Sequence, residues 1–339
     1  MAAEKLTFEK IIKDIENRVF YPIYYLHGEE SFFIDEISDK IADSVLNESE
    51  KDFDQMILYG RDTDIPGIVA NAKRYPMIAS YQVLIVKEAQ NLKDIESLLP
   101  YAQNPQKSSI LVFCHKYGKL DGRKKLGQFL KNDSNSVFFE SAKKYDNQIP
   151  DWISERVIKK GYRINPESSF LISEHLGNDL SKINNELEKL FISLKPGESV
   201  NQELIEKNIG ISKDFNVFEL QKALGEKNVI KCNRIINYFA SDLKNYPIQM
   251  VIPILFNYFT NLMTVHALTD KSSRNVASAL SINPFFVNDY MSAFKNYSYT
   301  KLFQIVGYLR EYDLKSKGVD NLSTEDGELM KELIFKILH

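Results

Sequence analysis

The chain has 339 residues, of which 44% are hydrophobic and 26% are charged; this balance excludes a disordered protein and favours two or three globular domains. Its 43 Lys and Arg against 46 Asp and Glu residues give a formal charge of -3, which excludes a basic character over the whole protein. No apolar run approaches the roughly 20 uninterrupted residues of a transmembrane helix, so we expect a cytoplasmic protein without a membrane partner.

Short β-branched runs alternate with amphipathic segments in residues 1–145. Helices are expected at 8–19 and 33–45, at 65–72 with Asp62 or Asp64 as the N-terminal cap, and at 92–99, ending near Pro100. Strands are expected at 23–26, 56–59, 83–86, 110–114 and 137–139. Because strands and helices alternate, we expect a parallel sheet that is covered by helices on both faces.

The strand signal ends near Pro150, and only helices are expected beyond it. A small bundle is predicted over 146–212, with helices at 149–161, 166–176 and 180–194 and a short helix that Asn201 caps and that ends near Gly210. The remainder, 213–339, is predicted to be helical and is rich in Phe and Tyr. These boundaries predict three domains: an α/β domain at 1–145, a helical domain at 146–212 and a second helical domain at 213–339.

The turn after the first strand occupies the place of a phosphate-binding loop in a P-loop ATPase. Such a loop needs G-x-x-x-x-G-K-[ST], because glycine amides and the lysine contact the phosphates and the hydroxyl holds Mg²⁺. The first glycine is Gly28, but the second glycine, the lysine and the hydroxyl are replaced by Phe33, Ile34 and Asp35. We therefore expect a degenerate site that binds no nucleotide.

The strand at 83–86 has the apolar frame of a Walker B motif, whose two acids position Mg²⁺ and the attacking water. Here the frame is followed by Lys87 and Glu88, so a lysine occupies the metal-binding position. No spacing of His and Cys indicates zinc, and no catalytic constellation emerges. We expect no cofactor, no metal and no intrinsic catalytic site, although any parallel α/β protein could carry such strands by chance.

Large apolar residues lie in the connection between the predicted helix at 65–72 and the strand at 83–86. They are Tyr75, Met77 and Ile78, and Pro76 between them favours an irregular backbone. Such a cluster either packs into the domain core or forms an exposed anchor for a protein partner. The residues alone leave both interpretations open.

Basic residues are locally in excess over 107–163, with 13 Lys or Arg against six Asp or Glu. This excess indicates either a polyanion contact or an ordinary solvated surface. The candidate DNA contacts within it are Lys119, Arg123, Lys124 and Lys125.

Two segments carry a family resemblance. The first is Tyr25–Phe33, and the second runs from Gly177-Asn178-Asp179-Leu180 to Glu186-Leu187-Glu188-Lys189-Leu190. In these segments the chain resembles the δ subunits of bacterial DNA polymerase III. The resemblance implies a degenerate AAA+-like domain, a small helical lid domain and an all-α collar domain for oligomerisation.

The resemblance also implies a function and partners. A δ subunit binds the β sliding clamp and opens its ring without hydrolysing ATP, as part of a DNA-directed DNA polymerase holoenzyme, which is a nucleotidyltransferase. Its implied partners are the ATPase (γ/τ) and δ′ subunits of the clamp loader, and primer-template DNA through the assembly. The implied clamp contacts are Tyr75, Met77 and Ile78. The rival hypotheses are an active AAA+ ATPase, such as a helicase loader, and a helical adaptor with no role in replication.

Overall fold

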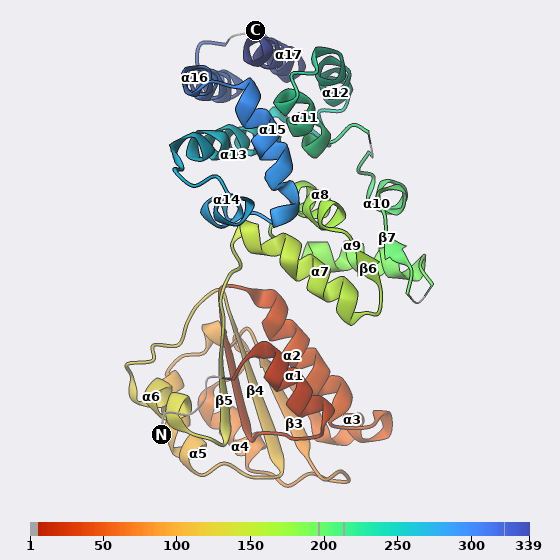
Figure 1. The fold of residues 1–339 in the computed structure, drawn as a ribbon. Helices are drawn as coiled ribbons and strands as arrows, with labels where there is room; N and C mark the ends of the chain where they lie inside the picture. The colour runs from red at the N-terminus through yellow and green to blue at the C-terminus, as the bar shows by residue number, and fades with distance from the viewer. Residues whose placement is uncertain (1–5, 196, 213, 322) are drawn as a thin grey trace. The chain divides into compact units, whose positions relative to one another are not determined.

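The computed structural model describes residues 6–195, 197–212, 214–321 and 323–339, and the chain divides into two compact units, Met1–Lys144 and Tyr145–His339 (Figure 1). The first unit contains α1 (Phe8–Glu16), β1 (Ile23–Gly28), α2 (Ser31–Ser44), α3 (Glu48–Asp54), β2 (Gln55–Tyr59), α4 (Ile65–Ala72), β3 (Gln82–Lys87), α5 (Leu99–Gln103), β4 (Ser109–Lys116), α6 (Lys125–Asn132) and β5 (Ser136–Ser141).

Five parallel strands form the centre of the first unit, in the order β2-β3-β4-β1-β5. Helices α1 and α2 cover one face of the sheet, and α4, α5 and α6 cover the other (Figure 1). Because both faces are covered, the inner strands are continuous apolar runs, and all four residues of Val83–Val86 are buried. This architecture confirms the predicted parallel α/β domain, and Asp64 is the cap of α4.

Two local predictions in the first unit are wrong, and two helices are absent from the prediction. Most of the expected helix at 92–99 is instead a 3₁₀ turn at Ile95–Leu98, and Pro100 lies in the first turn of α5, where a residue without an N–H group costs no hydrogen bond. Helix α1 ends at Glu16, so Val19 lies beyond it and is exposed. Helices α3 and α6 were not expected at all.

The second unit is mostly helical. Its elements are α7 (Ile149–Lys159), β6 (Arg163–Ile164), α8 (Pro166–Leu176), α9 (Leu180–Ile192), β7 (Ser199–Val200), α10 (Gln202–Ile209), α11 (Val217–Gly225), α12 (Val229–Ser241), α13 (Ile248–Ala267), α14 (Ser273–Leu280), α15 (Val287–Asn296), α16 (Tyr299–Ser316) and α17 (Asp326–Leu338). Its further division at 212/213 stays a prediction, and residue 213 lies outside the described residues.

The expectation of helices alone beyond Pro150 is wrong at one place. The connections before α8 and before α10 run in parallel and pair as the two-residue strands β6 and β7. The backbone N–H and C=O groups of the two strands form hydrogen bonds with one another. Because the paired segments are about 35 residues apart, this contact leaves no local sequence pattern.

A core of buried side chains from α11, α12, α13, α15, α16 and α17 stabilises the second unit. Helix α13 is long and apolar enough to cross a membrane by length and composition, but Val251, Leu255 and Phe259 on this helix are buried in that core. The core helix of a globular domain can have the same composition, so α13 is only weak evidence for a membrane span.

Candidate protein-binding site

The apolar loop, residues 73–81, connects α4 with β3 and presents large side chains to solvent. Tyr75 is 79% exposed, Met77 is 73% exposed and Ile78 is 58% exposed. The interpretation that these three side chains pack into the domain core is therefore wrong. A cluster of exposed aromatic and aliphatic side chains is typical of an anchor that enters an apolar pocket on another protein.

Asp54 holds the backbone of the apolar loop. This residue ends α3, immediately before β2, and is only 5% exposed. Its Oδ1 accepts a hydrogen bond from the Met77 N–H at 2.5 Å, and its Oδ2 accepts from the Ile78 and Ala79 N–H groups at 2.9 and 2.8 Å. Burial acts to raise the pKa of Asp54, but the three N–H donors outweigh it, and the pKa lies below its ordinary value.

Gln82 holds the other end of the same loop. At the start of β3, its Nε2 donates to the carbonyl oxygens of Ala72 at 3.2 Å and Arg74 at 2.5 Å, and lies 3.2 Å from Ser109 Oγ on β4. The side chain thereby joins the C-terminal end of α4 to the sheet. Asp54 thus fixes the loop by accepting hydrogen bonds from its amides, and Gln82 fixes it by donating to the carbonyl oxygens of Ala72 and Arg74.

The exposed apolar surface continues beside the loop. Asp54 joins the loop to the α3–β2 junction, where Phe53, Met56, Ile57 and Tyr59 are also exposed. Strand β2 is an edge strand, and an exposed apolar edge strand favours association with another protein. Sequence reasoning found the loop residues but missed α3 and Asp54, because the hydrogen bonds of Asp54 join residues 23 to 25 positions apart.

The turn between β1 and α2 does not have the form of a phosphate-binding loop. Strand β1 ends at Gly28 and α2 begins at Ser31, so two residues connect them. One of the free amides of the first helical turn is already occupied, since Glu30 Oε1 accepts from the Phe32 N–H at 3.0 Å. A Cβ atom on Gly28 would lie 2.0 Å from the Ser141 carbonyl oxygen, so this glycine allows β1 to approach the end of β5.

Three of the remaining candidate nucleotide-site residues are buried or paired with other protein groups. Ile34 is fully buried in the core beneath α2. Asp35 forms an ion pair with Lys116 at 2.6 Å, and Glu88 forms one with Arg61 at 3.3 Å. Lys87 ends β3 as Lys116 ends β4, so ammonium groups lie at the sheet edge where Mg²⁺ would need carboxylates. The described residues contain no cluster of three or more His, Cys, Asp or Glu that could hold a metal ion.

The four candidate DNA contacts differ in their surroundings. Lys119 forms an ion pair with Glu140 at 2.8 Å, and Arg123 forms one with Asp121 at 3.0 Å. Lys124 and Lys125 are exposed at the start of α6. The internal ion pairs reduce the charge that the first two residues offer to a polyanion, and DNA contact by this set stays a prediction.

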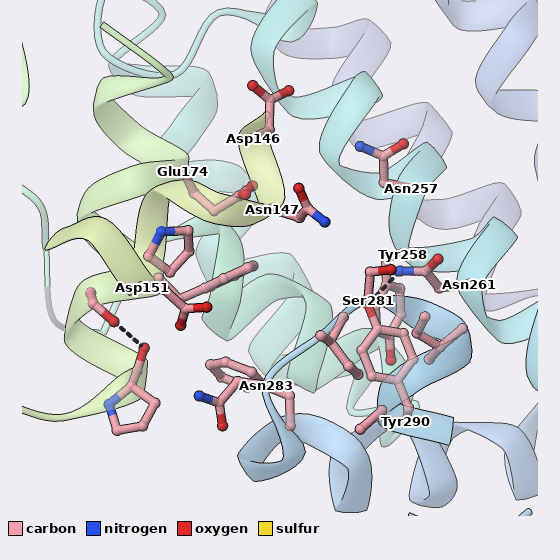
Figure 2. A pocket seen from close by; sticks show the side chains of 18 of the residues that line it. Asp146, Asn147, Asp151, Glu174, Asn257, Tyr258, Asn261, Ser281, Asn283 and Tyr290 are labelled. Atoms are coloured by element: carbon pink, nitrogen blue, oxygen red, sulfur yellow. Dashed lines mark hydrogen bonds between the residues drawn. The ribbon is translucent and has the colours of Figure 1, made fainter. Parts of the chain in front are cut away.

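A pocket of about 620 Å³ lies within the second unit, between the start of α7, α8 and the helices α13 to α15 (Figure 2). Figure 2 shows Asp146, Asn147 and Glu174 at one side, with Asn261 and Tyr290 across from them. Asn261 donates to the Tyr290 hydroxyl at 3.3 Å. Burial, together with repulsion from Asp146, raises the pKa of Glu174 to about 7.

Glu174→Gln is expected to stabilise the protein at pH 8 by about 1 to 2 kcal/mol, allowing for screening by water in the pocket. The pKa of Glu174 is about 7 in the folded chain and ordinarily 4.5. Wild-type stability should therefore fall between pH 4.5 and 7, as the unfolded chain loses this proton first. Urea unfolding at pH 5 and pH 8 should show a gain in stability several times larger at pH 8 than at pH 5. Glu155→Gln, at an exposed position of α7, serves as the control and should follow the wild type; an equal gain at both pH values would contradict this prediction.

The chain is similar to proteins of one family over most of its length. The family model described as DNA polymerase III, delta subunit matches residues 24–140, and the model described as the DNA polymerase III delta subunit, C-terminal domain matches residues 214–335. The DNA polymerase III subunit delta of Bacillus subtilis (strain 168) is 22% identical over 333 residues, which are 95% of this chain and 94% of the relative.

A solved structure shows the same fold. The Bacillus subtilis DNA clamp loader delta protein matches with a TM-score of 0.55 and 21% identity, and the match covers 98% of this chain and 99% of that one. These similarities confirm the predicted fold class at the level of a parallel α/β N-terminal domain followed by a mostly helical C-terminal part.

Proposed function

Because the chain belongs to the DNA polymerase III delta subunit family, we propose that it acts in a clamp loader as the subunit that binds the sliding clamp and opens its ring. The observation that carries this proposal is the apolar loop, whose exposed side chains are held on a rigid α/β domain. Opening a ring requires higher affinity for the open form than for the closed form. A rigidly held loop can supply this difference in affinity without ATP hydrolysis by the same subunit.

The proposed partners are the β sliding clamp, the ATPase (γ/τ) and δ′ subunits, and primer-template DNA through the assembly. The second unit offers surface for contacts between subunits, since Ile230 on α12, Phe303 on α16 and Phe335 on α17 are exposed. Helix α17 packs against both α12 and α16, which brings these exposed residues onto adjoining helices. Such apolar residues support packing against neighbouring subunits.

Clamp binding by the full-length chain without nucleotide tests this proposal. The sliding clamp of the same organism should bind immobilised protein with a Kd in the micromolar range or tighter, roughly −8 kcal/mol. A complete absence of binding by folded wild-type protein would contradict the proposal and would favour an adaptor with no role in replication.

We also propose that the chain neither binds nor hydrolyses ATP. Glu30 occupies the start of α2 with a carboxylate, Ile34 is buried where a lysine would contact phosphate, and Lys87 lies where an acid would hold Mg²⁺. Calorimetric titration with Mg-ATP should give no binding at micromolar concentrations. A parallel titration with the clamp shows that the sample is active. Micromolar ATP binding would contradict this proposal and favour an active AAA+ ATPase.

A further inference from the structure

The apolar loop lacks regular secondary structure, yet its backbone amides converge on a single carboxylate. The N–H groups of Met77, Ile78 and Ala79 all point at Asp54, which belongs to a different segment of the chain. Three successive amides on one anion fix the path of the backbone, because each hydrogen bond to a charged acceptor is stronger than a bond to a neutral one. The conformation of the loop therefore depends on a residue outside it.

We propose that Asp54 is a positioning residue for clamp binding: its carboxylate holds Met77 and Ile78 in the backbone conformation in which their side chains meet the clamp. This inference rests on the proposed function of the apolar loop. The advantage is preorganisation, since a loop that is already ordered loses less conformational entropy when it binds. Asp54 is itself buried and contributes through the loop rather than by direct contact.

The surroundings of Asp54 favour this role over a general contribution to stability. Its hydrogen bonds that the structure records come from the loop amides alone, and the ion pairs recorded for the described residues do not include it. Two of the three amides are those of Met77 and Ile78, whose side chains are exposed, and the third is that of Ala79, which follows them. The three N–H donors offset the effect of burial on the pKa of Asp54, so the carboxylate is charged at neutral pH and the hydrogen bonds to the loop persist.

Asp54→Ala and Asp54→Asn in the full-length chain test the inference. Asp54→Ala removes all three acceptor contacts and should weaken clamp binding roughly 10-fold or more, through loss of preorganisation. Asp54→Asn keeps one carbonyl oxygen, which can accept from some of the amides, and places an NH₂ donor beside the others. Its affinity should therefore lie between those of the wild type and Asp54→Ala.

Asp133→Ala is the matched control. Asp133 also accepts from a backbone amide, that of Asn135, at 3.2 Å, but it precedes β5, the edge strand opposite to β2. Its removal costs the hydrogen bonds from the Asn135 N–H and the Ser136 hydroxyl without touching the apolar loop. Clamp affinity of Asp133→Ala should equal that of the wild type even if the melting temperature falls.

Amide hydrogen exchange supplies a second measurement that needs no clamp. In Asp54→Ala the amides of residues 77–79 should exchange about 10-fold faster or more, while those of β1 and β4 keep wild-type protection. Unchanged clamp affinity in Asp54→Ala, with or without faster exchange, would overturn the inference, as would an equal loss in Asp133→Ala. Wild-type affinity is measured first: if the wild type does not bind, the proposed function fails, and the positioning role fails with it.

Discussion

Replacement of Met77 and Ile78 together by serine should weaken clamp binding by at least about 100-fold, which corresponds to roughly 2.7 kcal/mol. Buried anchors at the centre of an interface contribute most of its binding free energy, and these two side chains are the exposed aliphatic residues of the apolar loop. Because neither side chain lies in the core, the free energy of unfolding should change by less than about 0.5 kcal/mol. Surface plasmon resonance gives the affinity, and urea unfolding gives the stability.

Ile158→Ser with Ile192→Ser is the control for this double substitution. Both isoleucines are exposed, on α7 and α9 of the second unit, so the pair removes a similar amount of exposed apolar surface elsewhere. The control should bind the clamp as tightly as the wild type. Equal affinities for all three proteins would show that the apolar loop is not the clamp-binding site.

Gly28→Ala should destabilise the first unit by about 3 kcal/mol or more, or prevent its folding. The new Cβ atom would lie 2.0 Å from the Ser141 carbonyl oxygen. In addition, Gly28 has a φ of 141°, a backbone conformation that residues with a side chain rarely adopt. The surrounding groups are backbone of β5 and cannot turn aside as a side chain could. Circular dichroism and urea unfolding measure the effect.

Gly122→Ala is the matched control, because apart from Gly122 and its two chain neighbours no heavy atom of the described residues lies within 4 Å of the Cβ position there. Its stability should stay within about 0.5 kcal/mol of the wild type. The difference between the two variants tests whether Gly28, which resembles the first glycine of a phosphate-binding loop, is needed for packing against β5. A Gly28→Ala protein as stable as the wild type would contradict a packing role.

The strands of the first unit could be predicted from sequence because their signal is local. A strand that is buried on both faces is a continuous apolar run, and Val83–Val86 shows this pattern in the sequence and in the structure. Helix caps are similarly local, since Asn201 accepts a hydrogen bond from the Leu204 N–H three residues later. Such features need no knowledge of the tertiary fold.

The features that sequence reasoning missed depend on contacts between distant segments. Pro100 follows a helical pattern, which predicts the end of a helix there, whereas proline suits the first turn equally well. The β6–β7 pair forms only when two connections lie side by side. The apolar loop was located from sequence, but its exposure was not decided, because Tyr75, Met77 and Ile78 would be equally suited to a core. Its hydrogen bonds to Asp54 join two segments that carry no shared pattern.

The structure gives the missing ATP-binding residues a physical interpretation. Two charged groups of the degenerate site have a partner within the chain, because Asp35 pairs with Lys116 and Glu88 pairs with Arg61. Such pairing removes the unsatisfied charge that would otherwise attract Mg²⁺ or phosphate. In our proposal this domain serves as a rigid support for the apolar loop, and the energy of ring opening comes from binding.

Ring opening by the full-length chain is the most direct test of the proposed function. A clamp labelled with a pair of fluorophores across one subunit interface should lose energy transfer when wild-type protein is added without ATP. Met77→Ser with Ile78→Ser should leave the transfer unchanged, and Ile158→Ser with Ile192→Ser should act as the wild type does. Energy transfer that stays constant while saturating wild-type protein binds the clamp would contradict the proposed opening function.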